Sequence, residues 1–222
     1  AIANRTNPLT PRVLVNRVWL HHFGAGIVSS PDDFGNMAEK PTHPELLDWL
    51  SMRFMDDGWS LKKLHKRILM SATYRQSAAT DAKRLEKDFY NRLLSRGPRV
   101  RLDAEMIRDQ ALAVSGRLQS KVGGPSVYPV QVPNLWKEIG FLRPEIGMDE
   151  WPASEGPDLY RRALYTFWRR VCTYPTLATF DAPSREVCVS RRPRTNTPLQ
   201  ALTLLNDTQF HELAQQIAKK RK

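Results

Sequence analysis

Apolar side chains return every three or four residues along much of this chain, between clear signals for the start and the end of helices. Residues 10–24 show the pattern well. Thr10 and Pro11 match the residue before a helix and its first residue, and Gly24 suits the left-handed position that follows one. The apolar residues between these signals share one helical face: Leu14, Val15, Val18, Trp19 and Phe23. The pattern predicts an amphipathic helix.

The same reasoning predicts further helices. A capping box at Thr42 and Glu45 would open one, Ser60 would cap another, and Thr197 would cap a third. In a helix over 103–118 the residues expected to face inward are Met106, Ile107, Ala111, Val114 and Leu118. The expected helical ranges are 42–58, 60–74, 103–118, 159–172, 197–206 and 207–218, with shorter helices within 85–94 and 175–180. The aromatic residues of 159–172 leave a strand open there.

Residues 123–157 are rich in Pro and Gly and predict a long irregular excursion, with a short strand at 127–132. Trp136, Phe141 and Trp151 are expected to place it against the core. Strand signals are sparse elsewhere, so the sequence predicts a mainly α fold: one irregular helical domain of about six to eight helices over residues 1–222. Because the chain begins with Ala1 rather than Met, we expect a fragment of a larger multidomain protein.

The charge balance favours anionic partners. The chain has 34 Lys and Arg against 23 Asp and Glu, a net charge of +11, and such a surface attracts nucleic acid, acidic polysaccharide or acidic protein. Arginines are dense in 92–108 and in 161–194, where aromatic residues alternate with them. Two interpretations stay open, namely an anion-binding surface and structural pairing with carboxylates. No nucleic-acid-binding module is recognisable, and no apolar run is long enough to predict a transmembrane helix.

Sequence motifs for catalysis or metal binding are missing. His21 and His22 are adjacent on the first predicted helix, so their side chains point about 100° apart and do not easily share a metal ion. No HExxH, GxSxG, Walker or GxGxxG pattern occurs. Cys172 and Cys188 form no metal-binding framework, and whether they pair is open. The sequence predicts no metal site and no cofactor in this chain.

Several motifs, taken together and in order, resemble a known family. They include VNRVWLHHFG at 15–24, SPDDFG at 30–35, SATYRQ at 71–76, FDAPSREVC at 180–188 and TNTPLQAL at 195–202. The chain resembles the planctomycete-type PSD domain, also called domain of unknown function 1553, over nearly its whole length. The resemblance implies the C-terminal part of a large exported, periplasmic bacterial protein. It also implies neighbouring domains as partners, one of them c-type-cytochrome-like, so that haem would sit in a separate domain.

Three functional hypotheses follow. The first is a non-catalytic structural or binding module whose ligand is an anionic polysaccharide or a partner domain, with binding candidates Arg185, Arg191, Arg192 and Asn196. The second is an enzyme of unknown class with a polar site drawn from the family motifs: Arg17, His21, His22, Asp33 and Arg75. The alternative for these five residues is a polar network that fixes the fold. The third is a nucleic-acid binder, against which the exported context argues.

The segment 180–205 is expected to be a structural knot first and a binding surface second. Asp181, Arg185, Glu186 and Arg192 carry opposite charges close together in sequence, so we expect them to satisfy one another.

Overall fold

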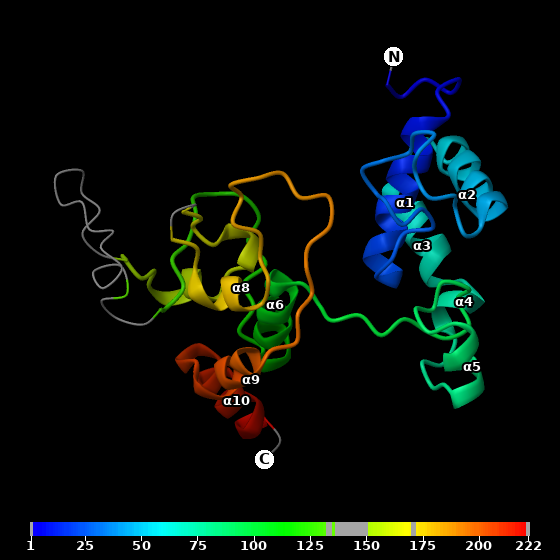
Figure 1. Cartoon of the computed structure of the whole chain (residues 1–222). Coiled ribbons are helices and arrows are strands. Elements are labelled where there is room, and N and C mark those ends of the chain that lie inside the picture. Colours follow the sequence, from blue (N-terminus) through cyan, green and yellow to red (C-terminus); the bar gives the residue numbers. More distant parts are fainter. Residues whose placement is uncertain (1, 132–134, 136–150, 170–171, 221–222) are drawn as a thin grey trace. The chain divides into compact units, whose positions relative to one another are not determined.

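The computed structural model describes residues 2–131, 135, 151–169 and 172–220 (Figure 1). Its contacts divide the chain into two compact units, Ala1–Val100 (unit 1) and Arg101–Lys222 (unit 2), and each unit is described by itself. The described residues form nine α-helices and no strand, which confirms the mainly α fold. The number exceeds the expected six to eight because several helices are only one turn long. The single domain over residues 1–222 stays a prediction.

Unit 1 contains five helices, and two of the four helix-end signals predicted for it hold. Its helices are α1 (Leu9–Phe23), α2 (Pro44–Asp56), α3 (Leu61–Leu69), α4 (Ala72–Arg75) and α5 (Ala82–Lys87). Gly24 ends α1 in the left-handed conformation, and the Ser60 hydroxyl accepts a hydrogen bond from Lys63 N at the start of α3. The cap at Thr10 is wrong, because Pro8 occupies the N-cap position of α1 and Thr10 lies inside the helix. The capping box at Thr42 is also wrong. His43 occupies the N-cap position of α2 without a side-chain cap, since Pro44 already provides a preset first residue.

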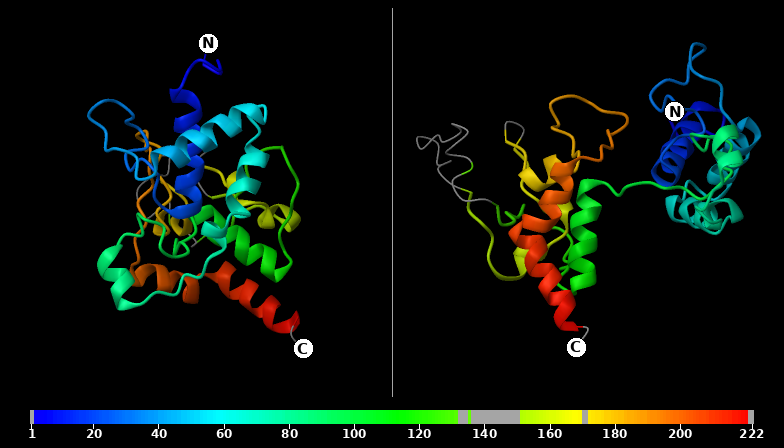
Figure 2. Two further views of the ribbon diagram at one scale, coloured as in Figure 1. Left: turned by 90° about the vertical axis from the view of Figure 1, so that its right-hand side faces the viewer. Right: turned by 60° about the horizontal axis from the view of Figure 1, so that its bottom comes forward.

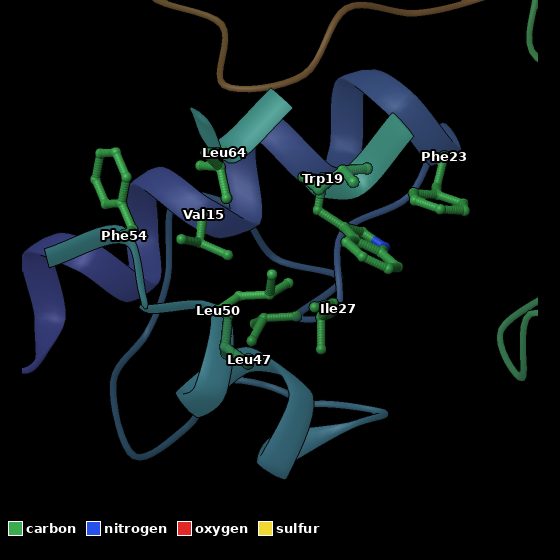
Figure 3. Close-up of a cluster of buried hydrophobic side chains, with 10 residues drawn as sticks. Val15, Trp19, Phe23, Ile27, Leu47, Leu50, Phe54 and Leu64 are labelled. Atoms are coloured by element: carbon green, nitrogen blue, oxygen red, sulfur yellow. The ribbon is translucent and has the colours of Figure 1, made fainter. Parts of the chain in front are cut away.

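The core of unit 1 lies between α1, α2 and α3 (Figure 3). The apolar stripes of the three helices meet there, as the spacing predicts. The residues at its centre are Val15, Trp19, Phe23, Ile27, Leu47, Leu50, Phe54 and Leu64. The rings of Trp19 and Phe23 stack with their centroids 4.1 Å apart. Burial of these side chains is the main stabilising contribution to unit 1.

A buried amide fixes the loop after α1 to the helix itself. Asn16 is completely buried; its amide nitrogen donates to Val28 O at 3.0 Å and its carbonyl oxygen accepts from Val28 N at 2.9 Å. The loop is packed so tightly at Gly26 that a Cβ atom on this residue would lie 2.4 Å from Val28 O. Asn16 therefore satisfies both polar backbone groups of a buried residue.

A turn of side-chain hydrogen bonds replaces most of the helix expected within 85–94. The carboxylate of Asp88 accepts from the backbone N–H groups of Leu93 and Ser95, and Asn91 adopts a left-handed φ of 54°. The helix α5 ends at Lys87, because the Asp88 side chain offers its neighbours hydrogen bonds that a helix cannot combine with its own.

Unit 2 is built around α6 (Ala104–Ser115), and α10 (Thr208–Lys220) packs along it (Figures 1 and 2). The helices α8 (Pro175–Thr179) and α9 (Pro198–Asn206) complete the helical part. The capping signal at Thr197 is confirmed, with a full capping box to Gln200. The apolar cluster of this unit contains Ala104, Ala163, Tyr174, Leu177 and Phe180.

The helix predicted for 159–172 is wrong. Two short 3₁₀ helices, η2 (Gly156–Tyr160) and η3 (Ala163–Tyr165), alternate with extended backbone. Gln119 N donates to Tyr160 O at 2.9 Å and Val127 N donates to Tyr165 O at 2.8 Å. These carbonyl groups are therefore engaged by a distant part of the chain and do not accept bonds from a helix.

The predicted strand at 127–132 is reduced, where the structure describes it, to an isolated bridge between Val127 and Thr166. Trp136 and Phe141, which were expected on the core, lie outside the described residues. Trp151 confirms its part of that prediction. Its ring stacks on Tyr174 with centroids 5.8 Å apart and its indole N–H donates to Pro129 O.

The buried face of α6 differs from the predicted one. Met106 and Val114 are 53 % and 57 % exposed, whereas Ala104, Arg108 and Leu112 are buried. The apolar pattern misleads here because an arginine occupies the centre of the buried face. The guanidinium of Arg108 donates to the side-chain oxygen of Gln209 and to the carbonyl oxygens of Arg161 and Leu159, at 2.7–3.0 Å. Burial lowers the pKa of Arg108.

A second buried arginine organises the segment that follows α6. Arg161 is 1 % exposed, and its guanidinium donates to the carbonyl oxygens of Lys121, Gly123 and Pro125. It also lies 3.9 Å above the ring of Tyr165. One side chain thus gathers three carbonyl groups of a loop that has no regular secondary structure of its own.

The helix α9 buries a polar residue and leaves its leucines exposed, which is the reverse of what its hydrophobic pattern predicts. Gln200 is buried and donates to Thr179 O at 3.0 Å, while the leucines of α9 face outward. Those exposed to between 47 % and 71 % are Leu199, Leu202, Leu204 and Leu205. A polar anchor, not an apolar face, attaches this helix to unit 2.

Candidate functional site

The candidate catalytic residue His22 has a partner that the sequence does not indicate. It lies in the last turn of α1, and its Nε2 is 2.8 Å from Nδ1 of His65 on α3. The two rings meet edge to face, with centroids 5.0 Å apart, and the Tyr74 ring also meets the His22 ring edge to face, with centroids 5.6 Å apart. Burial, followed by the nearby His65 and His21, lowers the pKa of His22. The ring is therefore neutral at neutral pH.

The other four residues of the predicted polar site do not join this group. Arg17, His21, Asp33 and Arg75 are all exposed. The Asp33 carboxylate accepts a hydrogen bond from Gly35 N at 2.9 Å, which is a local turn. Within the described residues no hydrogen bond or ion pair of the structure connects these four with His22 or with one another. The arrangement offers a neutral imidazole, and none of the described carboxylates is bonded to it.

The lowered pKa of His22 gives a pH dependence with a definite sign. The folded pKa lies below the unfolded value of 6.5, so the neutral ring contributes its full stability above about pH 6.5 and loses it as the pH falls through the folded pKa. We expect the melting temperature of the chain to decrease below about pH 6.5 and to depend less on pH in a His22→Gln variant. Circular dichroism melting curves across this range test it; parallel pH profiles for the two proteins would contradict it.

In unit 2 the segment 180–205 closes around the carboxylate of Asp181. This group accepts from Thr195 N at 2.7 Å, from the Thr195 hydroxyl at 2.9 Å and from the guanidinium of Arg101. Burial alone would raise the pKa of Asp181, but the bonds from Thr195 and the charge of Arg101 outweigh it and lower the pKa. Side-chain hydrogen bonds do hold this segment together, as expected of a structural knot. Its partners differ from those expected.

The expected pairing within 180–205 is wrong. Arg192 donates to Glu105 at 2.6 Å, and Arg194 lies 3.5 Å from Asp103, both at the start of α6. Arg185 has a left-handed φ of 64° and its guanidinium lies 4.3 Å above the ring of Trp168. The carboxylates that pair with Arg192 and Arg194 thus lie at the start of α6, about 90 residues earlier in sequence, so local charge alternation does not reveal them.

Three arginines of this segment line an open pocket. The pocket has a volume of about 350 Å³ and its walls are Arg191, Arg192, Pro193 and Arg194. Arg192 and Arg194 are paired as described, while Arg191 is exposed and forms no ion pair with any described residue. Of the four predicted binding residues, the structure brings Arg191 and Arg192 together; Asn196 is exposed a few residues further along and Arg185 contacts Trp168. The pocket can accept an anionic group through bidentate guanidinium contacts.

A second pocket of unit 2 was not predicted. It has a volume of about 430 Å³ and lies where α6 ends, beside Arg117, Gln119 and Tyr160. The Tyr160 hydroxyl donates to Glu212 at 3.0 Å, and the Arg117 guanidinium lies 4.1 Å above the Tyr160 ring. These residues come from three distant parts of unit 2, and no sequence motif connects them.

The fold and the pocket together define a basic, mainly helical protein with a pocket of arginine side chains at its surface. Over residues 1–222 the chain belongs to the PSD1 family, described as "Protein of unknown function (DUF1553)". The resemblance inferred from the sequence motifs is thereby confirmed. No curated protein and no solved structure matches the chain. None of the helices in the described part is both long and apolar enough to cross a membrane.

Proposed function

We propose that this chain is a non-catalytic binding module that recognises an anionic ligand, most directly an acidic polysaccharide. The observation that carries the proposal is the pocket of about 350 Å³ formed by Arg191, Arg192, Pro193 and Arg194. Two of its guanidinium groups are held in place by carboxylates of α6, while Arg191 keeps its charge uncompensated by any described carboxylate. Fixed and free guanidinium groups side by side suit sulfate or carboxylate groups on a polymer.

The charge of the whole chain supports the same class of ligand. A net charge of +11 raises the local concentration of polyanions and speeds their encounter with the surface. The pocket is open, so a polymer can pass through it without having to end there. Binding of this kind depends strongly on salt, because salt screens the attraction and because the guanidinium groups release cations that are condensed on the polyanion.

We also propose the setting that the family resemblance implies: a periplasmic or otherwise exported multidomain protein. In this proposal the neighbouring domains of the parent protein are further partners, and a separate cytochrome-c-like domain would carry the haem. The sequence of the parent gene product tests this directly, since a CxxCH motif and an export signal upstream of residue 1 are expected. Parent proteins of this family without either feature would refute the setting while leaving the pocket untouched.

Binding of heparin and of polygalacturonate tests the anion site. We expect wild-type chain to bind at least one of them at low salt and to lose binding as salt rises. Arg191→Ser should weaken binding about tenfold, as expected for the loss of one charge-assisted contact. The matched control is Arg84→Ser, which removes the same charge from an exposed position on α5.

The outcomes separate the pocket from general charge attraction. Equal losses in the two variants would assign binding to net charge and overturn the pocket. A wild-type chain without salt-sensitive binding of either polymer would remove the polysaccharide proposal altogether. A parallel filter-binding titration with duplex DNA addresses the nucleic-acid alternative, which retention of DNA at physiological salt would favour instead.

A further inference from the structure

We propose that His22 and His65 form a two-nitrogen binding site for a divalent transition-metal ion in unit 1. The site is independent of the anion pocket, which belongs to unit 2. Water would complete the coordination of the metal ion. The chemical class is the set of ions that imidazole prefers, namely Cu²⁺, Ni²⁺ and Zn²⁺, with Cu²⁺ bound most tightly.

The two ring nitrogens already face one another. Nε2 of His22 and Nδ1 of His65 are 2.8 Å apart, so a single proton lies between them and one nitrogen presents a lone pair to the other. Two imidazole nitrogens on one metal ion at about 2.0–2.1 Å are separated by about 3.3 Å in tetrahedral geometry. Replacing the shared proton with a metal ion therefore needs the two nitrogens to separate by about half an ångström and each ring to tilt by about 35°, so that both lone pairs point at the ion.

The backbone beneath both histidines is held by the core. Phe23, next to His22, is a core residue at the end of α1, and Leu64, next to His65, is completely buried in α3. The two helices contact each other directly. A metal ion would consequently bind to a pair of ligands that is already positioned, and it would cost little conformational entropy.

The pair is accessible from solvent. Both side chains are only half-buried, which leaves a path for the ion and for its water ligands.

The strength of the site is limited by its two ligands. Within the described residues no group of three or more His, Cys, Asp or Glu side chains could hold a metal ion. We therefore expect exchangeable binding with open coordination positions, unlike the closed sites that fold a zinc finger. The sequence gives no spacing motif for the pair, because the two histidines are 43 residues apart.

Titration of the untagged full chain with Cu²⁺, Ni²⁺ and Zn²⁺ by calorimetry tests the proposal. We expect one equivalent to bind, with the affinity for Cu²⁺ the highest. His22→Gln and His65→Gln should each weaken Cu²⁺ binding at least about tenfold and to a similar extent. The matched controls are His21→Gln, the exposed neighbour of His22, and His211→Gln, exposed on α10; both should bind like the wild type.

Electron paramagnetic resonance of the wild-type Cu²⁺ complex gives a readout that does not depend on the variants folding. We expect the nitrogen couplings of two imidazoles. Coupling to one imidazole or none would overturn the site, as would the absence of binding in calorimetry. A large loss of affinity in His21→Gln together with unchanged binding in His65→Gln would place the metal ion elsewhere and equally refute the pair.

Discussion

Replacing Arg161 with methionine is expected to lower the free energy of unfolding of unit 2 by about 3 kcal/mol. Methionine retains the apolar stem of the side chain but donates no hydrogen bonds. The carbonyl groups of Lys121, Gly123 and Pro125, which belong to exposed residues, would lose the buried guanidinium as their donor. A hydrogen bond from a charged group contributes about 1.5–3 kcal/mol. The contact of the guanidinium with the Tyr165 ring would also disappear.

Urea unfolding followed by hydrogen exchange of peptides from 101–131 measures this effect locally. The control is Arg162→Met, one residue further along. Arg162 is exposed and its ion pair with Asp109 spans 3.3 Å, so its loss should cost less than about 1 kcal/mol. If the two variants were equally stable, the loop 121–125 would not depend on Arg161.

Replacing Asn16 with leucine should destabilise unit 1 by about 2–4 kcal/mol. Leucine has nearly the same size and fits the helix α1, so the change tests the hydrogen bonds and not the volume of the side chain. Both the N–H and the carbonyl group of Val28 would remain buried without the partner that Asn16 supplies. The loop that carries Gly26 would then no longer be fixed to α1.

Urea unfolding with hydrogen exchange of peptides from 9–42 measures the loss. Arg17→Leu serves as the control, since it introduces the same residue at the adjacent, exposed position of α1. Its effect should stay within about 0.5 kcal/mol. A stable Asn16→Leu variant with unchanged exchange at Val28 would show that the buried amide is dispensable.

Local signals in the sequence predicted much of the fold. The ends of helices depend on a few neighbouring residues, which is why Gly24, Ser60 and Thr197 predict them correctly. The stripes of α1 and α2 also gave the core of unit 1, since apolar residues at helical spacing have few other ways to leave water.

The errors share a physical cause, namely partners that are distant in sequence. Residues 159–172 fail to form a helix because Gln119 and Val127 bind their carbonyl groups. The buried face of α6 differs from the apolar stripe because Arg108 satisfies backbone groups about 50 residues away. No periodicity reveals such contacts.

The sequence predicts only part of the candidate site, for the same reason. His22 was chosen because it lies in a family motif, but its partner His65 is on another helix. Arg191 and Arg192 were chosen from charge density, and the structure places both in one pocket. The carboxylates that hold Arg192 and Arg194 could not be inferred, because they belong to α6.

The residues that hold α9 in place differ from the residues that this helix exposes to its surroundings. Gln200 and its bond to Thr179 fix the helix, and the capping box at Thr197 sets its start. The outward leucines contribute little to either task. Polar residues can therefore replace the leucines on the outer surface of α9 while the fold of unit 2 stays the same. Gln200, in contrast, has little freedom to vary.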